Sequence, residues 1–95
     1  MIRYNQTTLD KLEAIPEKCG YILRYERGTF QSGYCILENK KVVVLNKFLQ
    51  QEGRINTLLE LIPQLEIKTE QLEEPLKKLY EEVLNNVPQN ENEIE

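Results

Sequence analysis

The most regular pattern of apolar and polar positions lies over residues 40–65. An unbroken apolar run from Val42 to Leu45 predicts a strand over 41–46, and such a run is typical of a central strand covered on both faces. After it, apolar side chains recur at the spacing of one helical face, at Ile55, Leu58, Leu59 and Ile62. This spacing predicts a helix that begins between Phe48 and Gln51 and that Pro63 ends or kinks near Ile62.

Two further strands are predicted ahead of this one, over 21–27 and 34–38. The first is rich in aromatic and β-branched side chains, and its alternation directs three residues toward the core: Tyr21, Leu23 and Tyr25. A loop over 28–33 separates the two strands, and Asn39-Lys40 is the tight turn expected before the third. Consecutive strands with short connections predict a three-stranded antiparallel sheet.

A helix is predicted on each side of this central region. The first has apolar residues at every third position, Leu9, Leu12 and Ile15, with Thr7 or Thr8 as its cap. It either ends near Ile15, ahead of Pro16, or continues with a kink to Cys19, and Gly20 suits its end in both cases. The last helix starts at Glu73 or Glu74, because Pro75 fits a first turn. Its apolar stripe is Leu76, Leu79, Tyr80, Val83, Leu84 and Val87.

The fold class that follows is α+β, with the N-terminal helix and two C-terminal helices packed on the sheet. Ninety-five residues suit a single domain, predicted here over 1–87, with a disordered acidic tail over 88–95. No secretory signal or apolar stretch of membrane-spanning length is visible, so a cytoplasmic protein without a membrane partner is expected.

The net charge of −4 is unevenly distributed. Residues 1–65 carry nine basic and seven acidic side chains, whereas residues 66–95 carry three basic and nine acidic ones. The acidic part argues against wholesale nucleic-acid binding, because phosphate contacts need clustered cations.

The residues of common catalytic centres are missing. The chain has no histidine, which removes the usual general base, the Ser-His and Cys-His pairs and most catalytic zinc sites. Cys19 and Cys35 fit no metal-binding spacing and are expected to be reduced and buried, with a disulfide as the alternative. We therefore expect no enzyme activity, no metal and no cofactor.

Basic and aromatic residues are interleaved along the predicted strands, and this is the one candidate binding surface. Its members are Arg24, Arg27, Tyr34, Lys40, Lys41, Lys47 and Arg54. Such a surface can bind single-stranded nucleic acid by phosphate contacts and stacking, or a protein partner. The alternative is that the aromatic residues pack the core and the cations are solvated strand edges.

The central stretch resembles the strand–helix core of the ImmA/IrrE family of zinc-dependent metallopeptidases over about residues 20–65. In that family a strand ending in Asn leads, through a connection containing Leu, to a helix with Arg and a Thr-Leu pair ahead of an HExxH motif. The matching residues are Val44, Leu45, Asn46, Leu49, Arg54, Thr57, Leu58 and Leu59.

Here Glu60 and Gln64 stand at the positions of the two ligand histidines, and Leu61 at that of the catalytic glutamate. Zinc hydrolysis needs the imidazoles and the carboxylate, so the resemblance implies a non-catalytic scaffold of similar shape. The chain also resembles small uncharacterised bacterial proteins with the same order of helix, hairpin and helix.

The broad apolar stripes of the two later helices leave room for a partner chain. The predicted function is therefore a non-catalytic protein-interaction or accessory module, with a homodimer as one form of that interaction. A nucleic-acid-binding module is the alternative. A small-ligand site in the crevice between sheet and helix is a third reading.

Overall fold

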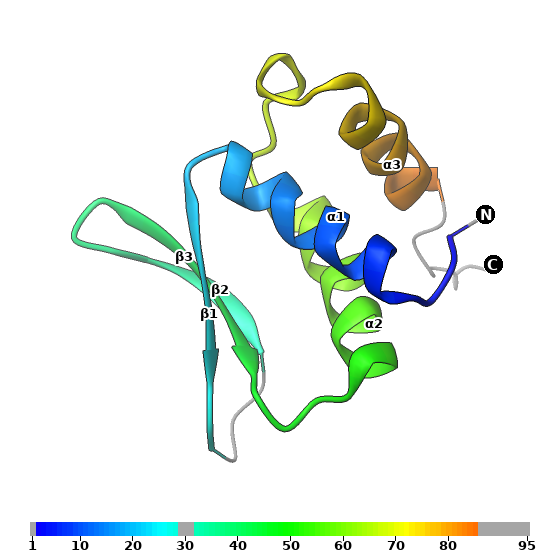
Figure 1. Cartoon of the computed structure of the whole chain (residues 1–95). Helices are drawn as coiled ribbons and strands as arrows, with labels where there is room; N and C mark the ends of the chain where they lie inside the picture. Colours follow the sequence, from blue (N-terminus) through cyan, green and yellow to red (C-terminus); the bar gives the residue numbers. More distant parts are fainter. Residues whose placement is uncertain (1, 29–31, 86–95) are drawn as a thin grey trace, which may run out of the picture.

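Strand β3 (Lys40–Asn46) is the centre of a three-stranded sheet (Figure 1). The structure, a computed structural model, describes residues 2–28 and 32–85. Strand β1 (Tyr21–Glu26) pairs with β3 in parallel, and β2 (Gly33–Leu37) pairs with it in the antiparallel sense. The order across the sheet is therefore β1-β3-β2.

The predicted α+β class is confirmed, but the purely antiparallel sheet is wrong, because β1 and β3 run parallel. Strand β2 forms the edge of the sheet far from β1, and β3 lies between the two. This order places the most apolar strand in the middle, where Val43 and Leu45 are fully buried.

Asn46, the last residue of β3, binds both ends of the connection over residues 27–32. Its backbone N–H donates to Ser32 Oγ at 2.9 Å, and its Nδ2 donates to the Gly28 carbonyl at 3.0 Å. Its Oδ1 also accepts a hydrogen bond from the Phe48 N–H at 3.0 Å, which turns the chain toward the next helix.

The hairpin between β2 and β3 has a two-residue turn. Glu38 and Asn39 both have positive φ angles, 49° and 69°. Two consecutive residues of this kind form the type I′ turn, whose twist matches that of antiparallel strands. The predicted turn at Asn39-Lys40 was one residue late, because Glu38 adopts a backbone conformation that its residue type rarely favours.

Helix α1 (Gln6–Lys18) continues through Pro16, so the longer of the two predicted alternatives is observed. The predicted caps, Thr7 and Thr8, are wrong: Asn5 caps the helix by accepting the Thr8 N–H at 2.9 Å. After the helix, Gly20 has a φ of 91°, which leads the chain directly into β1.

Helix α2 (Gln51–Leu61) ends before Pro63, as predicted, and a short 3-10 helix, η1 (Ile62–Gln64), follows. A connector leads to a second 3-10 helix, η2 (Thr69–Gln71), and to α3 (Glu74–Asn85). The start of α3 is as predicted; Val87 and the predicted tail over 88–95 lie outside the described residues.

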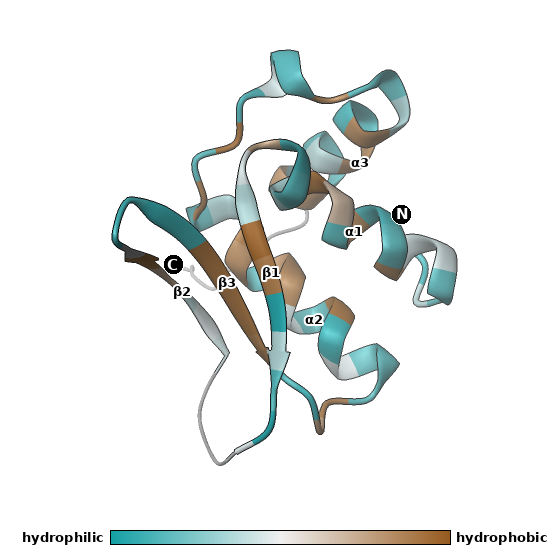
Figure 2. Ribbon diagram, turned by 60° about the vertical axis from the view of Figure 1, so that its left-hand side comes forward, coloured by the Kyte–Doolittle hydropathy of each residue, from teal (hydrophilic) through white to brown (hydrophobic). Residues whose placement is uncertain are grey.

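The core lies between the sheet and the helices, which all lie to one side of the sheet (Figures 1 and 2). Tyr21, Leu23 and Tyr25 face the core side as predicted, with Tyr21 the most deeply buried of the three. The buried core consists of Leu9, Leu12, Ile15, Tyr21, Val43, Leu45, Ile55, Leu58, Leu61, Ile62, Leu65, Leu72, Leu76, Leu79 and Val83.

The expectation that β3 is covered on both faces is wrong for the described residues. Figure 2 shows its apolar run, in brown, with helices to one side only. Val42 is buried, but it does not belong to the core cluster. Its neighbours across the strands, Ile22 and Cys35, belong to the face that the helices leave open.

Candidate functional site

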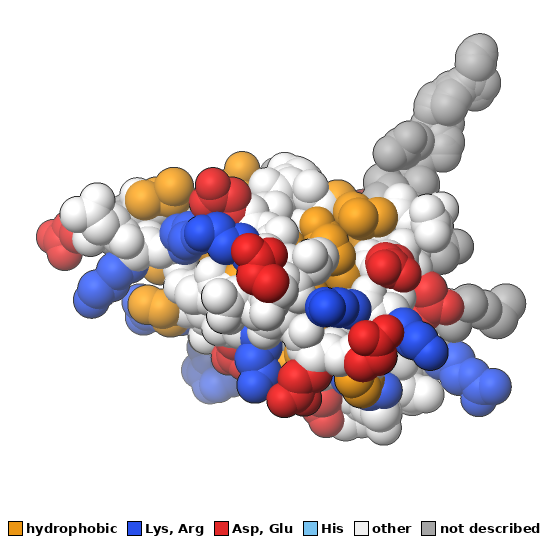
Figure 3. Space-filling view, turned by 90° about the horizontal axis from the view of Figure 1, so that it is seen from above, with side chains coloured by type: hydrophobic (Ala, Val, Ile, Leu, Met, Phe, Trp, Pro, Cys, Tyr) orange, Lys and Arg blue, Asp and Glu red, His pale blue; other side chains and the backbone are white. Residues whose placement is uncertain are grey.

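The seven residues of the predicted binding surface are spread over the molecule. Arg24 lies on the sheet face away from the helices and forms an ion pair with Glu26 at 2.7 Å, whereas Tyr34 lies on the opposite face. Three are exposed near strand ends: Arg27, Lys40 and Lys47. Figure 3 shows cationic and anionic side chains interspersed on the side that it views.

Arg54 joins the start of α2 to the preceding connection. Its Nε donates to the Leu49 carbonyl at 2.9 Å, and its Nη2 donates to the Lys47 carbonyl at 3.1 Å. Its guanidinium also lies over the Tyr25 ring, 4.4 Å from the centroid. Arg54 is therefore committed to internal contacts that connect β1, the end of β3 and α2.

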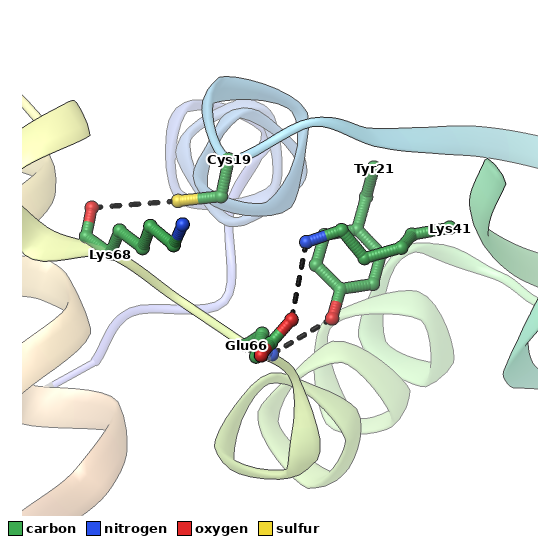
Figure 4. Close-up of polar contacts among 5 residues, drawn as sticks. All are labelled: Cys19, Tyr21, Lys41, Glu66 and Lys68. Atoms are coloured by element: carbon green, nitrogen blue, oxygen red, sulfur yellow. Dashed lines mark hydrogen bonds and ion pairs between the residues drawn. The ribbon is translucent and has the colours of Figure 1, made fainter. Parts of the chain in front are cut away.

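Lys41 has a similar internal role near the other end of β1 (Figure 4). Its ammonium lies 4.9 Å from the centroid of the Tyr21 ring and 3.4 Å from Glu66 Oε1. The Tyr21 hydroxyl in turn accepts the Glu66 N–H at 2.8 Å. These contacts hold the connector after η1 against the sheet. Two of the six cations in the predicted surface, Lys41 and Arg54, thus lie over tyrosines of β1.

Tyr25 donates a hydrogen bond to the Glu13 carboxylate of α1. Burial raises the pKa of its phenol well above the ordinary value, and the Glu13 contact raises the pKa further. The sequence indicated that Tyr25 faces the core, but it did not indicate this partner, because Glu13 lies on another element.

We expect alkaline unfolding to be linked to Tyr25. The folded state holds the phenolic proton more tightly than the unfolded chain, whose tyrosines ionise near pH 10. The stability contribution is therefore complete below about pH 10 and is lost as the pH rises above it. Part of the rise in phenolate absorbance should coincide with the loss of helical circular dichroism.

Tyr25→Phe should reduce the coincident part, which is the share of the rise in phenolate absorbance that occurs together with the loss of helical circular dichroism. It should not abolish it, because burial also raises the pKa of Tyr80. The control is Tyr34→Phe, which removes an exposed phenol and should leave the coincident part unchanged. A Tyr25→Phe titration identical to that of the unmodified chain would contradict the assignment.

Both cysteines are free thiols. Cys19 is half-buried, and its Sγ donates to the Lys68 carbonyl at 3.6 Å (Figure 4). Cys35 is exposed, so the predicted burial is wrong for this residue. It lies beside Val42, on a face that the sequence alone gave no reason to regard as uncovered.

The uncovered side of the sheet, called the open face here, is mainly apolar at its centre. Its described side chains are Ile22, Arg24 and Glu26 of β1, Lys40, Val42, Val44 and Asn46 of β3, and Cys35 of β2. Ile22 is 43% exposed, and Val44 is half-buried. The sequence indicated that this face is apolar, because apolar residues occupy both alternating sets of positions in β3. It did not indicate that the face is uncovered.

A groove of about 610 Å³ lies between the β2 side of the sheet and α2. Its lining comes from the start of β2, the end of β3 and the last turn of α2 with η1: Ser32, Gly33, Tyr34, Asn46, Leu49, Thr57, Glu60, Leu61 and Gln64. The volume lies within the usual range for small-molecule sites. Of these residues, only Tyr34 belonged to the predicted surface.

The spacing of Thr57, Glu60 and Gln64 in the sequence indicates one polar wall of this groove. At i, i+3 and i+7 they share one helical face, beside the buried Leu61. Glu60 and Gln64 both line the groove. No group of three or more potential metal-ligating side chains occurs in residues 2–28 and 32–85.

A second hollow, of about 390 Å³, lies between the N-terminal segment, α1 and α3. Arg3, Lys11 and Lys78 line it together with Glu82. Three basic side chains and one acidic one thus line this hollow, which gives the described lining a net positive charge.

Comparisons with protein-family models, with curated proteins and with solved structures find no match. Within the described residues, no helix combines the length and the apolar character that crossing a membrane requires. The candidate sites therefore depend on the geometry alone.

Proposed function

We propose that the protein is a non-catalytic interaction module that self-associates through the open face of its sheet. The observation that supports this is the one-sided cover of a sheet that contains a parallel strand pair. Purely parallel sheets are almost always covered on both faces, and this mixed sheet contains one parallel pair, β1 with β3. Here the helices cover one face, and Ile22, Val44 and Cys35 of the other remain accessible.

A second copy of the chain fits the charges of this face. Arg24 and Glu26 lie two residues apart on β1, carry opposite charges and leave the pair neutral. A two-fold axis can place Arg24 of one copy beside Glu26 of the other, because the same patch faces itself in such a dimer. The apolar row of Ile22, Val42 and Cys35 would then be covered on both copies.

The size of the face sets the expected affinity. Three strands about 4.8 Å apart, with about 3.3 Å per residue, give a face of roughly 250 Å² over five paired positions. A standard interface uses about 800 Å² per partner. We therefore expect a weak dimer whose population depends on concentration, rather than an obligate one.

The charge distribution favours this function over the nucleic-acid alternative. Arg24 is paired with Glu26, whereas Lys41 and Arg54 hold internal contacts. Three of the seven predicted residues are thus already engaged within the chain, and no face described above gathers the remaining cations.

Ile22→Lys should abolish self-association, because it places a charge at the centre of the paired faces. The measurement is the mass from light scattering or sedimentation equilibrium over a range of concentrations. The matched control is Ile36→Lys, which changes a more exposed isoleucine on the opposite side of the sheet and should leave the dimer intact.

Cys35 offers an independent readout. A short bismaleimide should link two copies through the exposed Cys35, and the Ile22→Lys variant should lose that product. A mass of one chain at every concentration would refute the dimer, and so would a dimer that survives Ile22→Lys.

A further inference from the structure

The groove beside α2 is the part of the molecule that self-association leaves unexplained. It opens on the helix-bearing side, since Tyr34 is paired with Val43, a core residue, and paired residues share a face. The open face lies on the other side of the sheet. A function of the groove is therefore independent of the proposed dimer.

Among the described residues that line the groove, only Glu60 carries a formal charge. Its carboxylate makes no hydrogen bond or ion pair with the described part of the chain. Gln64 Nε2 donates to the Glu60 backbone carbonyl at 3.0 Å, which leaves the Gln64 Oε1 as a further acceptor. The Thr57 hydroxyl lies on the same helical face. The polar wall of the groove thus offers mainly acceptors around one negative charge.

Tyr34 forms the opposite wall and is 43% exposed. The chain already pairs two tyrosines on this side of the sheet with cations: Lys41 lies over Tyr21, and Arg54 lies over Tyr25. Among the described residues, no cation lies over Tyr34. Its ring is therefore an aromatic face of the kind that attracts a positive charge, in the same groove as the Glu60 carboxylate.

The remaining lining residues narrow the ligand class. Leu49 and Leu61 are apolar and suit an aliphatic stem. One carboxylate is too few for a divalent metal site, which takes several oxygen ligands. A phosphate or carboxylate would meet Glu60 with the same sign of charge. An organic cation on an aliphatic stem satisfies the charge, the acceptors and the aromatic wall together.

We propose that this groove binds an alkyl guanidinium or ammonium group, with Glu60 as its counter-ion and the Tyr34 ring against its face. The group can belong to a free small molecule or to an arginine or lysine side chain of a peptide. Both sources present the same cation to the same walls.

The test is a titration of the ¹⁵N-labelled full chain, followed through backbone amide shifts. Butylguanidinium is the probe, and butylurea is the neutral control of the same length. We expect saturable shifts at Tyr34, Thr57 and Gln64 with butylguanidinium, at millimolar affinity for so small a ligand, and no saturable shifts with butylurea.

Two variants test the named contacts. Glu60→Gln should weaken binding about fivefold, the size expected for an exposed charge pair. Tyr34→Leu should weaken it about threefold through the lost ring. Glu52→Gln is the matched control, because it makes the same change in the first turn of α2, outside the groove, and should leave the affinity unchanged.

The two sources are separated with a blocked tetrapeptide that contains one central arginine. Tighter binding than butylguanidinium, with shifts extending along β2, assigns the cation to a peptide; equal binding assigns it to a free small molecule. Equal shifts with butylurea, or an unchanged affinity in Glu60→Gln, would overturn the site. Ile22→Lys should still bind the probe, so this test and the dimer test fail separately.

Discussion

Replacing Leu58 with alanine is expected to lower the free energy of unfolding by about 3 kcal/mol, the usual cost of truncating a buried leucine. Leu58 is fully buried in the core cluster and lies on the same face of α2 as the buried Ile55. Its removal leaves a cavity in this cluster, because the surrounding structure relaxes only partially. Urea unfolding followed by circular dichroism measures the effect.

Leu59→Ala is the matched control for that variant. Leu59 is the next residue in the same helix, but it is only partly buried and packs at the edge of the cluster. Its truncation should cost about 1 kcal/mol, since less apolar surface is lost. Equal costs for the two leucines would show that α2 presents a different face to the core.

Arg54→Ala is the second large effect, with an expected loss of about 2 kcal/mol from hydrogen bonds to a charged donor and from the stacked ring. The change leaves the carbonyls of Lys47 and Leu49 without their donors and removes the cation over Tyr25. The same unfolding measurement applies. Arg54→Lys should recover only part of the loss, because an ammonium cannot reproduce the forked donor geometry.

Arg27→Ala provides the reference for removing an arginine that forms no hydrogen bond or ion pair with the described residues. Arg27 is exposed, and we expect a change within about 0.5 kcal/mol, as for most surface substitutions. If Arg54→Ala were as mild as Arg27→Ala, Arg54 would not hold the β3–α2 connection. It would then be available for the binding surface that the sequence suggested.

Local sequence patterns predicted most of the elements, because their signals lie within a few residues of each other. The apolar run of β3, the spacing of Ile55 and Leu58, and the placement of Pro63 and Pro75 each constrain one segment. These predictions needed no knowledge of distant contacts.

The strand order and the candidate sites could not be predicted in this way. Whether β3 lies beside β1 or only beside β2 depends on burial summed over the whole sheet, and the short loops suggested the wrong neighbour. The groove likewise requires residues from β2, β3 and α2 to meet. Arg54 and Lys41 looked like surface cations because the tyrosines beneath them come from another strand.

The position of β3 between the two outer strands also sets a minimum length for the connection over residues 27–32. The end of β1 and the start of β2 lie on either side of β3, so two strand spacings, or roughly 10 Å, separate them. An extended chain needs about three residues for this distance, so a two-residue turn could join only neighbouring strands. The loop is therefore long enough for both strand orders, β1-β3-β2 and β1-β2-β3. A loop of two residues would permit only β1-β2-β3. Asn46 donates hydrogen bonds to Gly28 and to Ser32, and it therefore links residues next to both outer strands in the observed order.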